Sequence, residues 1–238
     1  MEFTFRSDMS VDLVQFSDYP DLMVGASARV STLGSKSLSD LATDSEAQRG
    51  LLDYLMHNRH MSPFEHNQFT FFVQCPIFVT REFMRHRTFS FNEESGRYKQ
   101  LDPVFYIPAD SRPLKQVGKA GAYEYVEGSK SQKMHVESSI KAASIYSYGR
   151  YKAMLDNGVA REVARMVLPV NIYTSFYATV NARNLMKFLS LRTKNEDATY
   201  PSYPQQEIEM VAEQMENLWT LKMPITASLF TKYGRVGL

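Results

Sequence analysis

The feature that most constrains the fold is an abrupt change in hydrophobic period at Pro76. Over Gln68–Cys75, apolar and polar side chains alternate, which is typical of a β-strand with one buried face. Pro76 interrupts the alternation, and because proline suits the first turn of a helix, we predict a helix over Ile77–His86. Arg81 and Arg85 lie four residues apart and therefore share one face of that helix. The chain is thus predicted to pass from a strand directly into a helix that carries cations.

Residues 85–98 complete this helix and continue beyond it with the sequence Arg-His-Arg-Thr-Phe-Ser-Phe-Asn-Glu-Glu-Ser-Gly-Arg-Tyr. Arginine presents a planar fork of donors that suits phosphate and carboxylate groups and keeps its charge at any working pH. Serine hydroxyls and a glycine that admits a close backbone approach complete a possible cradle for an anion. The segment therefore predicts an anion site, and a solvated basic loop is the alternative.

Composition and net charge limit what could attract such an anion and where in the cell the protein works. The 238 residues, 44% hydrophobic and 22% charged, are ordinary for a soluble globular protein. The net charge of +1 creates no global field for nucleic acid or an anionic membrane, so anion binding must come from local arginine clusters. The N-terminal residues lack the apolar core of a signal peptide and no apolar run is long enough to span a bilayer, so we expect a cytoplasmic protein.

The spacing of apolar residues along the sequence predicts one domain over residues 1–238. Its N-terminal part, roughly 1–116, should be rich in strands, and its C-terminal part, roughly 117–238, should be helical. A strand is predicted at 12–16, and strand plus loop at 101–116, where three prolines fall. Helices are predicted at 21–30, 45–58, 123–155, 159–167, 172–191 and 204–221.

Other catalytic chemistries fit the sequence poorly. A metal site at His57 and His60 would need one continuous helix, which Met61-Ser62-Pro63 breaks, and no His-Glu-x-x-His motif is present. Ser95 lacks the surrounding Gly-x-Ser-x-Gly sequence of a nucleophilic serine, so a phosphate-binding hydroxyl is favoured.

Cys75 is the only cysteine, which excludes an internal disulfide, and its place on the apolar face of a strand predicts burial. Glycine-rich nucleotide fingerprints are absent, so a dinucleotide would be bound by Arg, His and Asn side chains.

A second basic group follows in the helical half, at Arg161, Arg165, Arg183 and Arg192. On the helix predicted at 172–191, the stripe that ends at Arg192 lies opposite Arg183. Polar groups on two faces are typical of a helix that bridges two binding surfaces, and a helix with one solvent face is the alternative.

The pattern Arg-His-Arg-x-x-Ser-x-Asn-Glu-x-Ser-x-Arg-Tyr at 85–98 resembles the signature of the flavin-dependent thymidylate synthases. Six shorter blocks resemble the same family and follow in family order over most of residues 21–192: Ala28–Ser31, His60–His66, Phe69–Phe71, Pro76–Val79, Arg161–Pro169 and Val180–Arg183. The resemblance implies an α/β (α+β) fold, with a mainly antiparallel sheet packed with helices plus a helical half. It also implies conversion of dUMP to dTMP, with methylenetetrahydrofolate as carbon donor and FAD, reduced by NADPH, as hydride donor. Members are homotetramers with active sites between subunits, and no enzyme cysteine attacks the uracil ring.

The resemblance also implies roles for individual residues. FAD contacts are implied for Ser31, Ser62, Glu65, Arg85, His86, Arg87, Asn181 and Arg183. The dUMP set is Glu82, Glu93, Ser95, Gly96, Arg97, Arg165 and Arg192. Catalytic roles are implied for Arg192, at the uracil edge, and for His60, near the flavin and the folate. No metal is implied.

Two departures from the family pattern stand out. After Arg192, members usually carry a histidine, whereas this chain continues with Thr193–Ala198 and a segment rich in Tyr and Pro, with Glu196 as a candidate replacement. Lys187 stands where Asn or His is common. The altered segment keeps open a related flavin enzyme that hydroxymethylates a pyrimidine nucleotide. A non-catalytic RNA- or DNA-binding protein is the alternative of a different class, which the near-zero net charge disfavours.

Overall fold

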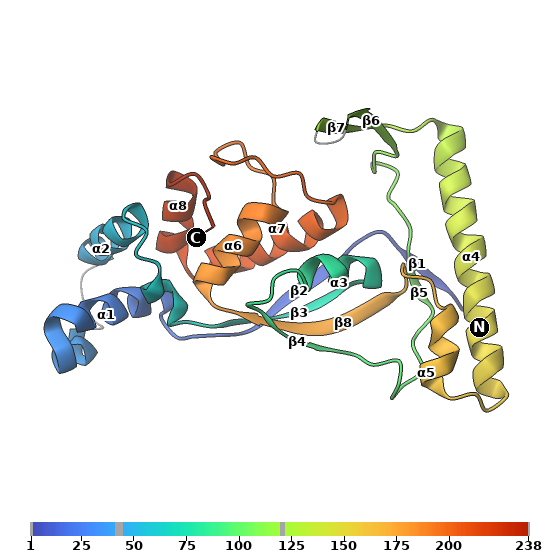
Figure 1. Cartoon of the computed structure of the whole chain (residues 1–238), viewed down its shortest axis with the longest axis horizontal. Coiled ribbons are helices and arrows are strands. Elements are labelled where there is room, and N and C mark those ends of the chain that lie inside the picture. The colour runs from blue at the N-terminus through green and yellow to red at the C-terminus, as the bar shows by residue number, and fades with distance from the viewer. Residues whose placement is uncertain (1, 41–44, 120–121, 238) are drawn as a thin grey trace. The chain divides into compact units, whose positions relative to one another are not determined.

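The computed structural model describes residues 2–40, 45–119 and 122–237 (Figure 1). Contacts divide the chain into two compact units. The first comprises Met1–Asp8, Cys75–Thr80 and Glu94–Thr174, and the second comprises Met9–Gln74, Arg81–Glu93 and Ser175–Leu238. The single domain over 1–238 stays a prediction.

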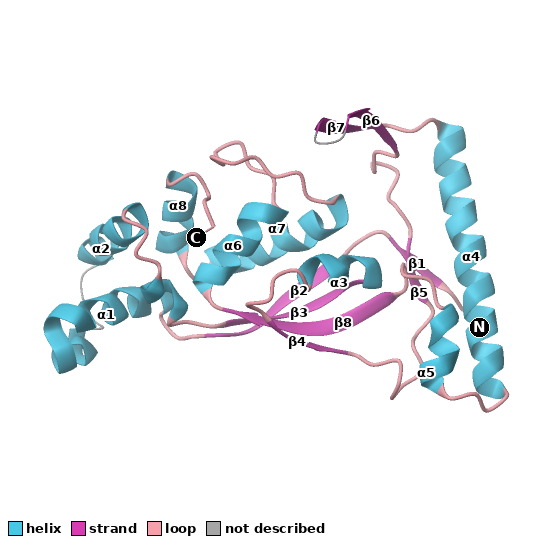
Figure 2. Ribbon diagram, viewed as in Figure 1, coloured by secondary structure: helices cyan, strands magenta, loops and turns pink. Residues whose placement is uncertain are grey.

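The described residues form both helices and strands (Figure 2). The strands are β1 (Thr4–Arg6), β2 (Ser10–Phe16), β3 (Phe69–Pro76), β4 (Ser90–Glu93), β5 (Val104–Tyr106), β6 (Lys115–Lys119), β7 (Ala122–Val126) and β8 (Tyr173–Val180). The α-helices are α1 (Pro20–Leu33), α2 (Ser45–His57), α3 (Ile77–Phe83), α4 (Lys130–Asp156), α5 (Arg161–Ala164), α6 (Ala182–Arg192), α7 (Gln206–Thr220) and α8 (Pro224–Lys232). Short 3₁₀ helices are η1 (Gly34–Asp40), η2 (Ser62–Glu65) and η3 (Arg165–Val167).

The second unit is built on a four-stranded sheet in the order β2-β3-β8-β4. The pairs β2–β3 and β4–β8 are antiparallel. Thr70 on β3 bonds Thr179 on β8, and Gln74 donates to Ser175. Because residue numbers rise along β3 while those of its partners fall, this central pair is antiparallel as well. The prediction of a mainly antiparallel sheet packed with helices is therefore confirmed.

One face of this sheet carries the core of the second unit. Phe69, Phe71 and Val73 on β3 are fully buried, as the alternation predicted. α6 and α7 pack against each other on this side of the sheet, and α7 contacts β2 (Figure 1). Most of the apolar stripe of α7 is fully buried, including Met215 and Trp219, while Leu218 is half-buried, which confirms the amphipathic helix predicted at 204–221.

The helix predicted over 172–191 is wrong. Residues 173–180 form β8, and the helix α6 begins only at Ala182. The β8 sequence Tyr-Thr-Ser-Phe-Tyr-Ala-Thr-Val is rich in aromatic and β-branched residues, which suit a pleated strand between two partners. Asn181 then caps α6, because its side chain accepts a hydrogen bond from the backbone N of Asn184 at 2.9 Å.

Two other helix boundaries differ from the prediction. The helix predicted over 123–155 begins at Lys130, and β7 occupies part of its expected first turns. Ser129 sets the start of α4 through a capping box with Gln132. The helix predicted to run to His86 ends at Phe83, because the following residues turn toward β4.

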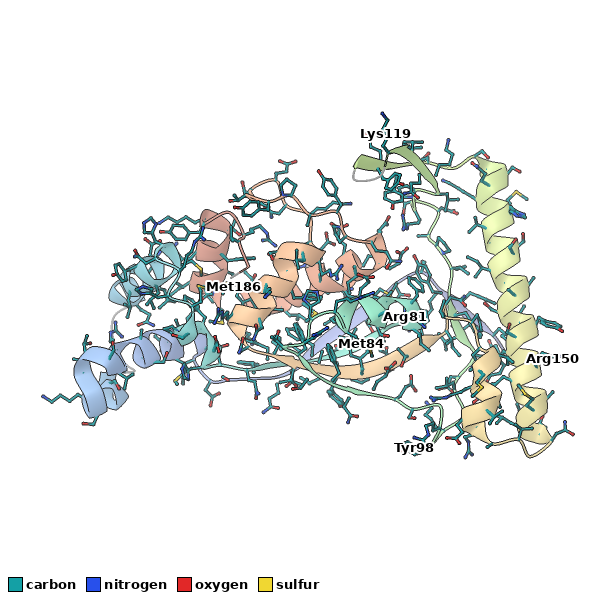
Figure 3. The ribbon with its side chains drawn as sticks, viewed as in Figure 1. Arg81, Met84, Tyr98, Lys119, Arg150 and Met186 are labelled. Carbon is teal, nitrogen blue, oxygen red and sulfur yellow. The ribbon has the colours of Figure 1, made fainter. Side chains whose placement is uncertain are left out.

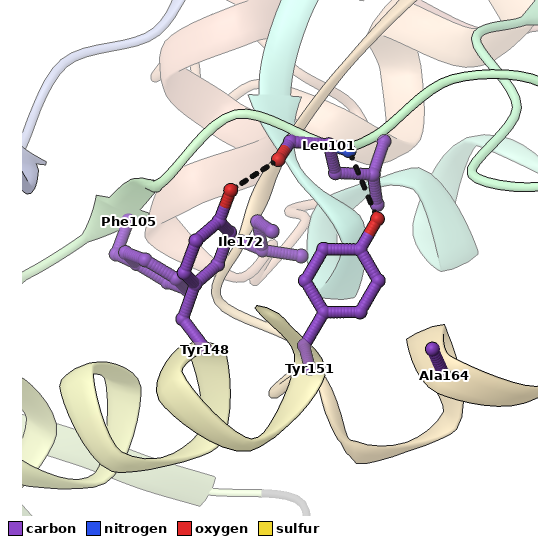
Figure 4. Packing of buried hydrophobic residues seen from close by; sticks show 6 residues of the cluster. All are labelled: Leu101, Phe105, Tyr148, Tyr151, Ala164 and Ile172. Carbon is purple, nitrogen blue, oxygen red and sulfur yellow. Dashed lines mark hydrogen bonds between the residues drawn. The ribbon is translucent and has the colours of Figure 1, made fainter. Parts of the chain in front are cut away.

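The first unit has a small parallel sheet, β1–β5, packed beside α4. Its core contains Leu101, Phe105, Tyr148, Tyr151, Ala164 and Ile172 (Figure 4). Tyr148 donates its hydroxyl to the carbonyl of Leu101 at 2.7 Å, and Tyr151 accepts from the N–H of the same residue at 3.2 Å. Both backbone groups of Leu101 are thereby bonded to α4, which fixes the end of the loop that follows β4. Within the described residues, no helix is both long and apolar enough to cross a membrane.

Candidate active site

Three predicted site residues meet at the C-terminal end of α6. Arg192 Nη1 forms an ion pair with Glu82 Oε2 at 2.8 Å, and Arg192 Nε donates to His86 Nε2 at 3.1 Å. The side chain of Arg192 is only 17% exposed, so its cation is largely removed from water. A cation held by two partners keeps one orientation, which suits it to meet a charge that develops on a bound molecule.

His86 is neutral in this arrangement. Burial, together with the charges of Arg192 and Lys187, lowers the pKa of His86 to about 4. The ring packs at 4.9 Å from Phe188 and 6.2 Å from Phe89, between centroids. Because Nε2 accepts from Arg192, the single proton of the neutral ring resides on Nδ1. His86 therefore orients Arg192 without competing with it for an anion.

Arg85 and Arg87 flank His86 but differ from it in exposure. Both are exposed, whereas His86 is buried. The three residues were assigned together as FAD contacts, which stays a prediction, and the structure joins His86 to Arg192 of the dUMP set. The two exposed guanidiniums remain suited to a phosphate or pyrophosphate.

A second cluster of predicted FAD residues lies at the N-terminal end of α6. Glu65, at the end of η2, forms an ion pair with Arg183 in the first turn of α6. Asn181 is the cap of that helix, and η2 packs against it. Ser62 begins η2 and is exposed.

Asn67 belongs to the same cluster and was missed from the sequence. It is 6% exposed, and its Oδ1 accepts from the N–H of Ala182 at 2.7 Å. Its Nδ2 has no hydrogen-bond partner within the described part of the chain. The sequence signal was its place directly after the block His60–His66. A buried donor without a protein partner is costly, so a bound group beside α6 would satisfy it.

Ser31 and His60 lie in the second unit as well. Ser31 is exposed on α1, and its hydroxyl donates to the carbonyl of Ala28 at 2.9 Å. His60 is exposed beside Tyr54, with ring centroids 6.0 Å apart. It follows Arg59, whose φ of 59° places it in the left-handed region.

In the first unit, the predicted phosphate residues come together. The N–H of Arg97 donates to the Ser95 hydroxyl at 3.2 Å, which closes a tight turn around Gly96. A Cβ at Gly96 would lie 3.2 Å from Cδ of Arg165, so glycine allows that arginine its close approach. Arg97 pairs with Glu162 at 3.0 Å, and Tyr98 beside it points away from the ribbon (Figure 3).

The remaining site residues are placed as follows. Glu93 is the half-buried last residue of β4 and pairs in register with Phe176 on β8. Glu196, the candidate replacement for the family histidine, is exposed. Cys75 is fully buried, as predicted. Among the described residues, no cluster of His, Cys, Asp and Glu is suited to a metal ion.

A cavity of about 400 Å³ lies at the C-terminal end of α6. Arg192 and Ser190 line one side, and the Tyr/Pro segment Tyr200–Pro204 lines another. Arg235, near the C-terminus, also lines it and was not anticipated from the sequence. A space of this size is typical of sites for small molecules.

Known proteins resemble this chain over nearly its whole length. The family model described as "Thymidylate synthase complementing protein" matches residues 12–225. The flavin-dependent thymidylate synthase of Streptomyces avermitilis is 53% identical over 98% of this chain and 95% of that protein. That of Streptomyces coelicolor is 55% identical over 97% and 94%, respectively.

Solved structures agree with this match. The UMP/dUMP methylase PolB from Streptomyces cacaoi bound with 5-Br dUMP is 52% identical, covers 99% of this chain and 100% of that one, and superposes with a TM-score of 0.92. The same protein bound with 5-Br UMP gives a TM-score of 0.90 at 50% identity, over 99% of each chain. The predicted fold class, enzyme class and flavin cofactor are thereby confirmed. The chain belongs to the family of the flavin-dependent thymidylate synthases.

Proposed function

We propose that this chain converts dUMP to dTMP, with methylenetetrahydrofolate as the carbon donor and NADPH as the source of reducing equivalents for FAD. The observation that carries the proposal is the buried cation of Arg192, held by Glu82 and by a neutral His86 in a chain of this family. Its chemistry suits a pyrimidine that acquires negative charge as its ring is activated toward the methylene carbon.

The residues assigned to dUMP divide by chemistry. Arg97 and Arg165 are exposed, and the backbone N–H of Arg97 donates to the Ser95 hydroxyl, a set of donors that suits a phosphate monoester. Arg192, with Glu82, suits the polar edge of uracil, and Glu93 is assigned to the same nucleotide. We assign the first group to a phosphate and the second to a uracil ring.

The residues present fit FAD. Arg85 and Arg87 offer charged donors for its pyrophosphate. Four of these residues gather around the start of α6: Ser62, Glu65, Asn181 and Arg183. There the buried Nδ2 of Asn67 has no partner among the residues that the structure describes. When bound, FAD supplies the redox step, while the chain binds and orients the reactants. We assign Ser31 to the same cofactor and His60 to the neighbourhood of the flavin and the folate.

We also propose that four copies assemble and that the enzyme works in the cytoplasm. One face of the four-stranded sheet supports association, because the rings of Phe72 and Tyr177 pack there, tilted by 54° with centroids 5.1 Å apart, and Tyr177 is 48% exposed. Light scattering after size exclusion tests this, and the mass expected is four times 27.3 kDa. A monomer at working concentration would contradict it.

The activity is tested first by visible spectroscopy under anaerobic conditions. We expect oxidised-flavin bands that bleach with NADPH, at a rate that changes when dUMP is present. A colourless protein that does not take up added FAD would contradict the proposal. In that case, steeply salt-dependent binding of an oligonucleotide would support the nucleic-acid alternative.

UMP is a second candidate substrate, because the similar methylase PolB is described as acting on UMP and dUMP. Turnover of both nucleotides should be compared, with the products analysed by mass. A product heavier by CH₂ supports methylation, and one heavier by CH₂O supports the hydroxymethylating alternative. Faster turnover of UMP than of dUMP would change the substrate assignment.

A further inference from the structure

The last described residues of the chain return to the end of α6. We call Gly234–Gly237 the C-terminal strap. The carbonyl of Gly234 accepts from the N–H of Thr199 at 2.8 Å, and a Cβ on Gly234 would lie 1.9 Å from the Thr199 hydroxyl. A Cβ on Gly237 would lie 2.6 Å from Cα of Lys187 in α6. Side chains at both glycines would collide with their neighbours, so the strap is built to lie close against this helix end.

Arg235 is the buried anchor of the strap. The residue is 4% exposed, and its φ of 54° is in the left-handed region, which arginine rarely adopts. Its guanidinium binds both carboxylate oxygens of Glu216 on α7, at 2.6 and 2.7 Å, and lies 4.9 Å from the ring centre of Phe230. A buried charge in a strained backbone persists where the surrounding structure requires it.

The third partner of Arg235 is the residue that follows Arg192. Arg235 Nη2 donates to the hydroxyl of Thr193 at 2.8 Å. That hydroxyl donates to the carbonyl of Leu189 at 2.8 Å, which closes the last turn of α6. The carbonyl of Thr193 accepts from Ser202 at 2.5 Å. Thr193 thus connects the strap, the end of α6 and the Tyr200–Pro204 segment.

These contacts determine the shape of the cavity beside Arg192. The cavity of about 400 Å³ has Arg192 on one wall and Tyr200–Pro204 on another. Thr193 follows Arg192 directly in the chain, and its carbonyl accepts a hydrogen bond from Ser202 in the other wall. A displacement of Thr193 would move the Cα of Arg192 and the tyrosine-bearing wall together. The position of a guanidinium matters to less than 1 Å when it must meet a developing charge.

We propose that Arg235 is a positioning residue of the nucleotide site, acting through Thr193 to place Arg192 and the Tyr200–Pro204 wall against the pyrimidine of dUMP. This rests on the proposed function, and specifically on the assignment of Arg192 to dUMP. The alternative is that Arg235 only joins α7 to the C-terminus.

The sharpest test leaves the Arg235–Glu216 pair intact and removes the Thr193 hydroxyl, with its bonds to Arg235 and to the Leu189 carbonyl, while the N–H of Thr193 still bonds that carbonyl. We compare Thr193→Val, which loses the hydroxyl at nearly constant shape, with Thr193→Ser, which retains it. In the full-length enzyme loaded with FAD, Thr193→Val should bind dUMP about tenfold more weakly, with unchanged FAD content. Its melting temperature should fall modestly, because a buried N–H of Arg235 loses its acceptor. Thr193→Ser should bind dUMP within about twofold of wild type.

The matched control is Lys232→Met, which removes an exposed ion pair with Asp53 in the same C-terminal region. Its dUMP affinity should equal that of wild type. If Thr193→Val retains normal dUMP affinity, or loses FAD and dUMP together, the positioning role of Arg235 is wrong.

A double-mutant cycle separates this proposal from the proposed function. If Thr193 acts through Arg192, Thr193→Val should have little further effect on dUMP affinity in an Arg192→Ala background. Additive losses would overturn the positioning role. Normal dUMP affinity in Arg192→Ala alone would instead overturn the assignment of Arg192, and with it the basis of the proposed function.

Discussion

The neutral His86 predicts a specific dependence of stability on pH. Its pKa is about 4 in the folded protein, against 6.5 for an unperturbed histidine. Between these values the unfolded chain binds a proton that the folded chain does not. The stability from this residue is therefore fully present above pH 6.5 and is lost as the pH falls toward 4. At pH 5, the linkage relation gives a loss of about 2 kcal/mol relative to pH 7.5.

The assay is urea unfolding of wild type and His86→Gln at pH 7.5 and pH 5. Glutamine retains an oxygen that accepts from Arg192 but does not titrate in this range. The free energy of unfolding of wild type should fall by about 2 kcal/mol more than that of the variant, because other titrating groups are common to both. His135→Gln, at an exposed position on α4, is the matched control and should retain the wild-type dependence. An equal fall in wild type and His86→Gln would refute the argument that His86 is buried and neutral.

Three further predictions concern binding and turnover. Arg192→Ala should lower kcat/KM for dUMP at least about a hundredfold while FAD is retained, measured by steady-state kinetics and flavin absorbance; loss of FAD from the folded variant would contradict its place at the pyrimidine. Arg87→Ala should weaken FAD binding about tenfold, measured by titration of the apoprotein, and an unchanged affinity would count against the assignment of Arg87 to the cofactor. Gly96→Ala should weaken dUMP binding about tenfold, because the added Cβ would lie 3.2 Å from side-chain atoms of Arg165 and Leu101. The affinity is measured by calorimetry, and a wild-type value would contradict the assignment of the turn at residues 95–97 to dUMP.

Elements with a strong local period were predictable. The alternation around Phe71 predicted the buried face of β3, and the apolar stripe that ends at Trp219 predicted the buried face of α7. Phe71 and Trp219 are both fully buried. The chemistry of the signature at 85–98 predicted only an anion site, and the family was predicted from the resemblance of its long pattern to the family signature.

The boundary between β8 and α6 could not be read in the same way. Residues 173–180 are apolar enough for a buried helix or a buried strand, and short runs of this kind do not distinguish the two. Pairing with β3 and β4, which come from distant parts of the sequence, decided for the strand. Asn181 then became a helix cap rather than the middle of a longer helix.

The sequence by itself determined which chemical groups this protein brings to a nucleotide and a flavin, because residue type fixes charge, hydrogen-bonding capacity and local period. Only the tertiary structure decided which groups act together. Arg192 and His86 are 106 positions apart in the chain, yet they are bonded, and burial beside Phe188 makes the histidine neutral. Arg235 lies 42 positions beyond Thr193, and its role depends on their contact. Burial and proximity follow from packing of the whole chain, so no local pattern specifies them.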